Sequence, residues 1–408
     1  MNNLHWTSIW GNAVSIAENR PESFSKNITL RYPIHCPFDG NGLKLTFDNY
    51  CGTESIKIAQ VTILVNNVFY DVLFDDTPSV AIEPGKSVVS DEIDVYVSAN
   101  DTIQVSFYLE DYTQMRSAVY VQGPLSGGSY CIGDCTSTEM FSIDTSRKTN
   151  IVYFLTDVSI RTSERNHSIL CYGDSITAQD WPDYLQMMFD SLQTKTDDLQ
   201  VILDSTQTQS DNSNAESDKK YIPKAYSVIR KATSGSRILR EYSCITYESY
   251  GLKATNRFCH EVPSANGIDT IIIQQGINDI IHPVGVDVNP FRPMSDLPTI
   301  DELIEGFKYY ITEARKLGLK IYVGTLLPIK GWRTYADFRD VLRNQFNEFL
   351  RTTDLVDGCI DFDAAVRDPK DLAAFLPVYD SGDHLHPSAE GYKAMAQAAY
   401  EVLKVNKD

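Results

Sequence analysis

The chain of 408 residues lacks any apolar run near the roughly 20 residues that a membrane-spanning helix needs. Its first residues, Met1 to Trp6, also lack the basic segment followed by an apolar segment that marks a secretory signal. Hydrophobic residues still make up 42% of the chain, enough for a well-packed core. We therefore expect a globular, cytoplasmic protein that makes no use of a membrane.

Positive charge is scarce. Lys and Arg number 36 against 55 Asp and Glu, which gives a formal net charge of -19. Such a balance argues against nucleic-acid binding and against docking on an anionic membrane surface, because both need a basic face. Neutral or cationic small molecules are the partners that remain, and the sequence leaves open whether the chain forms a homo-oligomer.

Cysteine is sparse and scattered, with 8 residues over the whole chain. Without a secretion signal, free thiols are a better expectation than a disulfide framework. Cys131-x-x-x-Cys135 is the one close pair, and no second Cys or His pair follows at zinc spacing, so we interpret it as structural. The segment 84–87, Pro-Gly-Lys-Ser, lacks the first glycine of a phosphate-binding loop, because Val80 stands there.

The first 160 residues show the rhythm of β-strands. Short segments alternate apolar and polar residues, with turn signals rich in Gly, Asn and Asp between them: 43–47, 56–65, 88–97 and 103–109. The Gly- and Ser-rich segment 123–135 is expected to be a loop, and 150–159 a strand that leads into the second half. This spacing predicts an all-β sandwich domain, jelly-roll-like, over residues 1–160.

From about residue 165 the pattern changes to strands that alternate with helices, which predicts a parallel α/β domain over 165–408. The expected strands are 168–172, 225–230, 269–275, 319–324 and 358–362. The expected helices are 181–193, one opened by a capping box at 299–302 and ended at Gly318, 335–352, and a last one from Ser388 to about 404. The polar segment 193–220 between them is expected to be a mobile surface insertion.

Four short polar segments follow strands of this second half or precede its last helix: 173–175, 234–235, 276–279 and 383–386. In open α/β sheets, ligands bind beyond the carboxyl ends of the strands. We therefore expect the four segments to meet in one site.

The residue types at these positions fit acyl transfer. Ser175 supplies a hydroxyl, which is a poor nucleophile without a base; His386 supplies the base and Asp383 the carboxylate that orients it. A tetrahedral intermediate also needs hydrogen-bond donors for its oxyanion. The backbone N–H groups of Ser175 and Gly235 and the side-chain amide of Asn278 are the candidate donors.

In these segments the chain resembles an SGNH hydrolase of the GDSL esterase/lipase superfamily. Gly173-Asp-Ser-Ile176 corresponds to the family's first block, with Ile in place of Leu, and Gly235 to its second-block glycine. Gly276-Ile-Asn-Asp279 and Asp383-His-Leu-His386 correspond to the third and fifth blocks. The resemblance implies a three-layer α/β/α sandwich with a five-stranded parallel sheet, flavodoxin-like, with Ser175 as nucleophile and no metal or other cofactor.

The first half more loosely resembles the β-rich domain of two-domain bacterial carbohydrate esterases, some of which act on acetylxylan. The combined resemblance implies a serine esterase that removes acetyl groups from plant cell-wall carbohydrate through an acyl-enzyme on Ser175. Its substrate would be acetylated xylan or small acetylated xylo-oligosaccharides. The absence of a Gly-x-Ser-x-Gly segment argues against an α/β-hydrolase.

Two alternatives stay open at this stage. One is a lysophospholipase or thioesterase that acts on longer acyl chains. The other is a carbohydrate-binding or assembly module whose α/β half is catalytically idle.

Several residues near the expected site allow either a functional or a structural interpretation. Trp332 and Arg237 are candidates for substrate binding, with a purely structural role as the alternative for each. His384 competes with His386 for the role of base. Asp174 and Asp279 are interpreted as hydrogen-bond acceptors that brace loops, rather than as acids in the chemistry.

Overall fold

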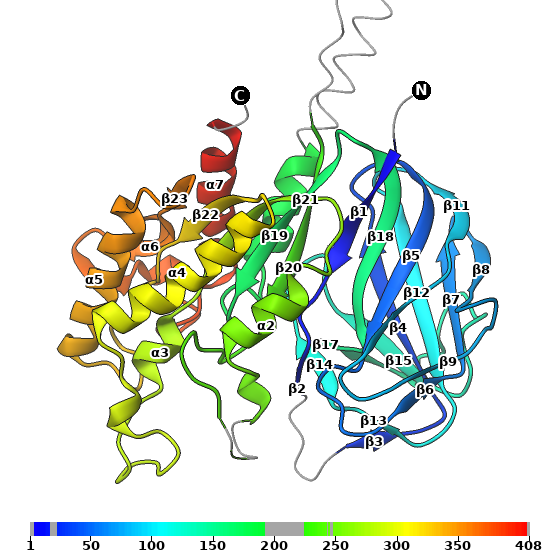
Figure 1. Ribbon diagram of the computed structural model, residues 1–408, viewed down its shortest axis with the longest axis horizontal. Coiled ribbons are helices and arrows are strands. Elements are labelled where there is room, and N and C mark those ends of the chain that lie inside the picture. Colours follow the sequence, from blue (N-terminus) through cyan, green and yellow to red (C-terminus); the bar gives the residue numbers. More distant parts are fainter. Residues whose placement is uncertain (1–3, 17–22, 192–223, 243, 245–247, 406–408) are drawn as a thin grey trace, which may run out of the picture.

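The computed structural model describes residues 4–16, 23–191, 224–242, 244 and 248–405. The segment 193–220, for which a mobile insertion was expected, lies outside the described residues. The β-strands of the first half and the α/β layers of the second half lie side by side (Figure 1).

The first half is built from two main antiparallel sheets. One has the order β1 (Leu4–Gly11), β18 (Leu155–Ser163), β5 (Gly40–Asp48) and β10 (Ser87–Val89), with β11 (Ile93–Val97) also paired to β5. The other has the order β16 (Ser146–Thr149), β15 (Gly128–Ile132), β4 (Ile28–His35), β12 (Thr102–Leu109), β7 (Gln60–Val65) and β8 (Val68–Val72). Smaller pairings join β3 (Phe24–Ser25) to β13 (Thr113–Gln114), β6 (Ile56–Ile58) to β9 (Val80–Ile82), and β14 (Ser117–Tyr120) to both β2 (Ser15–Ile16) and β17 (Ile151–Tyr153).

The two main sheets share one hydrophobic core. Phe47 on β5 meets Phe107 on β12 edge to face, with ring centroids 5.2 Å apart, which is a favourable aromatic geometry. Alternate residues of β5 are buried in this core, as a half-buried strand requires. The first half is therefore β-rich and layered as predicted, while its jelly-roll connectivity and the domain boundaries stay predictions.

Three predicted segments of this half differ from the structure. The single strand expected over 56–65 is divided into β6 and β7, which pair with β9 and β12 respectively. The strand expected over 88–97 is interrupted at Ser90, whose hydroxyl accepts a hydrogen bond from the N–H of Leu45. Residues 123–135, expected to be a loop, contain β15, which pairs with β4. Pairing partners distant in sequence decide each case, so local alternation could not reveal them.

The second half contains a five-stranded sheet in which every strand is parallel to its neighbours. Its order is β20 (Tyr226–Ala232), β19 (His167–Gly173), β21 (Ile268–Gln274), β22 (Lys320–Gly324) and β23 (Gly358–Ile360). In chain order this is the 2-1-3-4-5 arrangement of flavodoxin-like sheets. The predicted five-stranded parallel sheet is confirmed.

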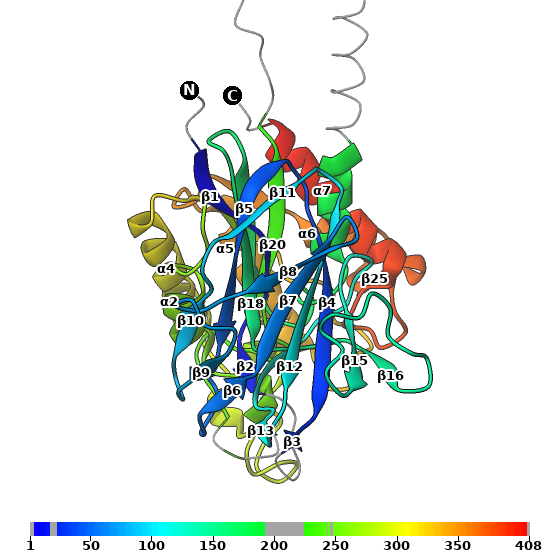
Figure 2. The ribbon, with the colours of Figure 1, turned by 90° about the vertical axis from the view of Figure 1, so that its right-hand side faces the viewer.

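Helices cover both faces of this sheet. Residues 181–191 are helical, followed by α2 (Ala254–Glu261), α3 (Ile277–Ile281), α4 (Ile300–Lys316), α5 (Asp337–Thr352), α6 (Phe362–Val366) and α7 (Ala389–Val405). Three 3-10 turns, η1 (Glu248–Tyr250), η2 (Met294–Asp296) and η3 (Pro377–Tyr379), and a hairpin of β24 (Arg367–Asp368) and β25 (Asp371–Phe375) complete the half. In Figure 2, α2 and α4 lie on one side of the sheet and α7 on the other. Within the described ranges, no helix combines the length and apolarity that crossing a membrane requires.

Local signals explain the helix boundaries well. Thr299 accepts a hydrogen bond from the Glu302 N–H and Glu302 accepts one from the Thr299 N–H, which is the predicted capping box of α4. Ser388 likewise accepts a hydrogen bond from the Gly391 N–H at the start of α7. These caps satisfy N–H groups that would otherwise lack partners at the start of each helix.

Buried polar contacts join the two halves. The hydroxyls of Ser168 and Ser227, on β19 and β20, both donate to the Ser8 carbonyl of β1, at 2.5 and 2.6 Å. The Lys231 ammonium on β20 is fully buried and donates to the carbonyls of Asn12 and Thr156, each at 2.9 Å. The first half is therefore fixed against the edge strand of the parallel sheet.

Candidate active site

The four polar segments meet at the carboxyl edge of the parallel sheet. Ser175 follows β19, Gly235 follows β20 and Asn278 lies in α3, directly after β21. Asp383 and His386 lie in the loop between η3 and α7. The tight turn after β19 requires Gly173, because a Cβ there would lie 2.4 Å from Thr177 Oγ1 and 2.6 Å from the Gln274 carbonyl.

Ser175, His386 and Asp383 form a continuous hydrogen-bond chain. Ser175 Oγ lies 2.9 Å from His386 Nε2, and His386 Nδ1 lies 2.7 Å from Asp383 Oδ2. Since a carboxylate can only accept, Nδ1 carries the proton and Nε2 of the neutral ring is free to accept from the serine. This is the arrangement that turns a serine hydroxyl into a nucleophile.

The Asp383 carboxylate is held in its ionised form. Its Oδ1 accepts hydrogen bonds from the N–H groups of Leu385 and His386, at 2.9 and 2.8 Å. Burial alone would raise the pKa of Asp383, but the hydrogen bonds from the His386 ring and from these N–H groups outweigh it and hold the pKa well below its usual range. A permanent negative charge therefore faces Nδ1 of His386.

Three candidate hydrogen-bond donors lie at the edge of the sheet where Ser175 follows β19. Within the described ranges, no acceptor takes the backbone N–H of Ser175 or of Gly235. One N–H of the Asn278 amide donates to the Ser236 carbonyl at 3.1 Å, which fixes the amide and leaves its second N–H for a ligand. The three donors proposed for an oxyanion hole thus come from the ends of three neighbouring strands.

Gly235 needs to be glycine for two reasons. Its φ of 75° lies in the left-handed region, and a Cβ there would lie 2.4 Å from Cγ of Tyr250. The Tyr250 ring therefore packs directly on the loop that carries the second donor. Sequence reasoning missed Tyr250, because the segment around it has neither periodicity nor a motif.

Asp174 and Asp279 brace loops, as predicted. Asp174 accepts from the Ile176 N–H at 3.1 Å, and Asp279 accepts from the N–H groups of Ile238 and Leu239 at 2.8 and 3.0 Å. Burial raises the pKa of Asp174 to about 7 and that of Asp279 to about 6. Among the described residues, neither carboxylate hydrogen-bonds to the Ser175 side chain, while the positive form of His386 would favour ionised Asp174 electrostatically.

His384 is directed away from Ser175. Its Nδ1 bonds to Asp380 Oδ2 at 2.5 Å, and its ring packs where a Cβ of Gly331 would otherwise lie. The His384 side chain is half exposed, and the hydrogen bond of Ser175 goes to His386 instead. The geometry therefore favours His386 over His384 as the base.

Trp332 and Arg237 differ in their relation to the site. The Trp332 ring stands at 87° to the His386 ring, with centroids 6.5 Å apart, so it lies beside the candidate base. Arg237 has a side chain only 2% exposed, with its guanidinium 3.3 Å from Asp296 and over the ring of Tyr242. These contacts fit a structural role for Arg237 better than substrate binding, whereas Trp332 stays a candidate.

In the part of the chain that the structure describes, no group of three or more His, Cys, Asp or Glu side chains could hold a metal ion. All eight cysteines are free of disulfide bonds.

The family model for GDSL-like lipases and acylhydrolases matches residues 169–399, more than half of the chain. The protein therefore belongs to this family of ester hydrolases. The match spans all the residues of the hydrogen-bond chain and the candidate donors. No curated protein is similar enough in sequence to count as a relative.

Similar solved structures include an acetylxylan esterase from Geobacillus stearothermophilus, at 16% identity over 58% of this chain and 93% of that one, with a TM-score of 0.35. A GDSL-like lipase from Bacteroides thetaiotaomicron is 15% identical over 59% of this chain and 89% of that one, with a TM-score of 0.35. An acetyl xylan esterase is 18% identical over 58% and 99%, with a TM-score of 0.34. Likeness of this extent assigns no substrate to the present chain.

Proposed function

We propose that the protein is a serine esterase that removes acetyl groups from carbohydrate, with acetylated xylan or xylo-oligosaccharides as the substrate class. The observation that carries the proposal is the Ser175–His386–Asp383 hydrogen-bond chain, at 2.9 and 2.7 Å. In this proposal residues 165–408 form the catalytic domain and residues 1–160 an accessory β-sandwich.

The first half-reaction begins when Ser175 Oγ attacks the ester carbonyl carbon and gives its proton to Nε2 of His386. The carbonyl oxygen becomes an oxyanion, which accepts hydrogen bonds from the N–H groups of Ser175 and Gly235 and from the Asn278 amide. The tetrahedral intermediate then expels the sugar alkoxide, which takes the proton from the imidazolium. An acetyl-enzyme on Ser175 and a free sugar hydroxyl result.

The second half-reaction releases acetate. His386 Nε2 removes a proton from water, and the resulting oxygen nucleophile attacks the acetyl carbonyl. The same donors stabilise the second oxyanion, and the Ser175 oxygen leaves with the proton from His386. Throughout, the ionised Asp383 stabilises the imidazolium and keeps its Nδ1–H in place.

Aromatic and polar groups at the rim support a carbohydrate as the alcohol component. The partly buried Trp332 ring lies beside His386 with the Arg333 guanidinium over it, and a sugar combines apolar faces and hydroxyls that suit such a pair. A long-chain lipase would instead need an extended apolar lining. The acetyl group and the xylan backbone are the most specific parts of the proposal and depend on the experiment that follows.

The test is acetate release from acetylated xylo-oligosaccharides, measured beside p-nitrophenyl acetate and p-nitrophenyl octanoate. We expect the wild type to release acetate from the oligosaccharides and to prefer the acetate ester over the octanoate ester. Preference for octanoate would support the lysophospholipase or thioesterase alternative. If the protein cleaves only the aryl acetate, it is still a serine esterase, but carbohydrate is not its substrate.

A further inference from the structure

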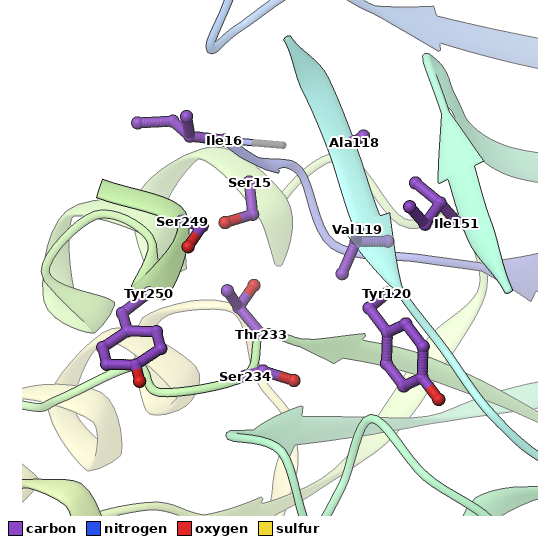
Figure 3. A pocket seen from close by; sticks show the side chains of 10 residues that line it. All are labelled: Ser15, Ile16, Ala118, Val119, Tyr120, Ile151, Thr233, Ser234, Ser249 and Tyr250. Atoms are coloured by element: carbon purple, nitrogen blue, oxygen red, sulfur yellow. The ribbon is translucent and has the colours of Figure 1, made fainter. Parts of the chain in front are cut away.

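We propose that a cavity between the two halves of the chain is a carbohydrate subsite, in which residues of the first half bind a sugar unit of the substrate. The cavity has a volume of about 250 Å³. Figure 3 shows the side chains that line it. They are Ser15, Ile16, Ala118, Val119, Tyr120, Ile151, Thr233, Ser234, Ser249 and Tyr250. This inference rests on the proposed function, since it names where that substrate binds.

The cavity adjoins the candidate oxyanion loop. Thr233 and Ser234 line it and immediately precede Gly235, one of the three candidate donors. Tyr250 also lines it, and the same ring packs against Gly235. A group held in this cavity would therefore lie next to the loop that receives the oxyanion.

The opposite wall is anchored to the segment that follows Ser175. Tyr120, at the end of β14, donates from its hydroxyl to Gln122 Oε1 at 3.1 Å. The backbone N–H of Gln122 donates to the Ala178 carbonyl at 3.1 Å, three residues after Ser175. The two walls thus have a fixed position relative to the nucleophile, as a substrate subsite requires.

Two hydroxyls in the cavity have no hydrogen-bond partner among the described residues. They are Ser15 Oγ and Thr233 Oγ1, both on residues that are 2% exposed. In Figure 3 the side chains of Ser15, Thr233 and Ser249 lie on one side of the cavity, across from Tyr120 and Ile151. Buried polar groups without partners are uncommon in folded proteins, and either an ordered water or a polar ligand in the cavity would satisfy these two hydroxyls.

The lining favours a sugar over an acyl chain. Two tyrosines and four further hydroxyl-bearing residues face four aliphatic ones, so the cavity offers both hydrogen bonds and apolar contact. A sugar ring has matching hydroxyls and apolar faces. An acyl chain would displace water from the Ser15 and Thr233 hydroxyls without replacing its hydrogen bonds, which is unfavourable.

The first experiment measures binding without turnover. Xylotriose is titrated calorimetrically into the full-length chain carrying Ser175→Ala, and into the same chain with Ser15→Ala and Thr233→Val added. These two substitutions remove the hydroxyls and nearly keep the shape. We expect xylotriose to bind the first protein and to bind the second at least about tenfold more weakly. Equal affinities, or no binding to the first protein, would overturn the subsite.

The second experiment separates this inference from the proposed function. KM is measured for acetylated xylo-oligosaccharides and for p-nitrophenyl acetate in wild type, Ser15→Ala with Thr233→Val, and Tyr120→Leu. We expect both variants to raise KM for the oligosaccharides at least about tenfold more than for the aryl ester. If the variants changed KM equally for both substrates, the substituted residues would have a structural role, and the proposed subsite would be wrong.

The matched control for Tyr120→Leu is Tyr112→Leu, which alters an exposed tyrosine outside the cavity. Failure of the wild type to release acetate from any acetylated sugar would contradict the proposed function. The subsite would still be decided by the xylotriose titration, which needs no catalysis.

Discussion

His384 and His386 lie two residues apart and each bonds through Nδ1 to its own aspartate. The pairs are Asp380–His384, at 2.5 Å, and Asp383–His386, at 2.7 Å. Asp380 also accepts from the N–H groups of Gly382 and His384, so it shapes the loop from which Asp383 and His386 project. The first pair therefore holds the loop, and the second pair faces Ser175.

This division of roles predicts unequal effects. His386→Gln should lower kcat by at least about 1000-fold, because it removes the base. His384→Gln should lower kcat about tenfold with little change in KM, because it only loosens the loop. Both are measured with p-nitrophenyl acetate. A larger loss in His384→Gln than in His386→Gln would make His384 the base.

Ser175→Ala should lower the activity at least about 1000-fold without loss of folding, since the side chain is small and, among the described residues, hydrogen-bonds to His386 alone. Ser191→Ala, at an exposed serine in the helix after the site, is the control and should keep full activity. Acetate release and circular dichroism are the measurements. Full activity in Ser175→Ala would contradict the proposed mechanism.

Asn278→Ala should lower kcat by about 100- to 1000-fold, the usual loss for one oxyanion donor. KM should change little, because the donor acts on charge that develops in the transition state. Asn344→Ala, at an exposed asparagine of α5, is the control. If the two substitutions lowered kcat equally, the assignment of Asn278 as an oxyanion donor would be wrong.

The activity should fall on the acid side of its pH profile. Because hydrogen bonds keep the pKa of Asp383 well below its usual range, this carboxylate stays ionised through mildly acidic pH. Loss of kcat/KM as pH falls then reports protonation of a histidine base, with about a tenfold fall per pH unit. A rate that is flat from pH 4 to 8 would contradict a histidine base.

The pH dependence of the free energy of unfolding should reveal the raised pKa of Asp174. Its pKa is raised by burial to about 7 in the folded protein, against about 3.9 for an unfolded aspartate. Below about pH 4 the carboxyl is neutral in both the folded and the unfolded state, so its ionisation does not change the free energy of unfolding. As pH rises from 4 to 7 the unfolded state loses its proton first, so the folded state is increasingly disfavoured.

Asp174→Asn should therefore leave the free energy of unfolding nearly unchanged at pH 4 and raise it by about 1–4 kcal/mol at pH 8. The asparagine oxygen can still accept from the Ile176 N–H. Urea unfolding at both pH values is the measurement, with Asp144→Asn at an exposed carboxylate as the control. If the difference in free energy of unfolding between wild type and Asp174→Asn were the same at both pH values, it would contradict the raised pKa of Asp174.

The sequence predicted the α/β half better than the β half, for a physical reason. Its strands are short apolar runs buried on both faces, and caps such as Thr299 and Ser388 mark the helices locally. In the β half, the break between β6 and β7 depends on which distant strand each one pairs with. Local alternation does not contain that information.

The candidate site shows the same limit. Ser175, Asn278 and His386 lie in motifs, so their meeting at one sheet edge could be predicted. Tyr250 and Ser15 lie in no motif: Tyr250 gains its place by packing on Gly235 within the second half, and Ser15 gains its place because the two halves pack together. The unbonded hydroxyl of Ser15 is a property of the folded chain, not of the residues around it in sequence.

The buried Lys231 has a consequence for how such a chain can evolve. Burial lowers the pKa of this ammonium, and the nearby Asp157 partly offsets the effect. Its carbonyl partners, at Asn12 and Thr156, belong to the first half. Without that half, the ammonium would lose both carbonyl acceptors and would be hydrated instead. A different β-rich half placed against this sheet would therefore have to supply acceptors for the same ammonium.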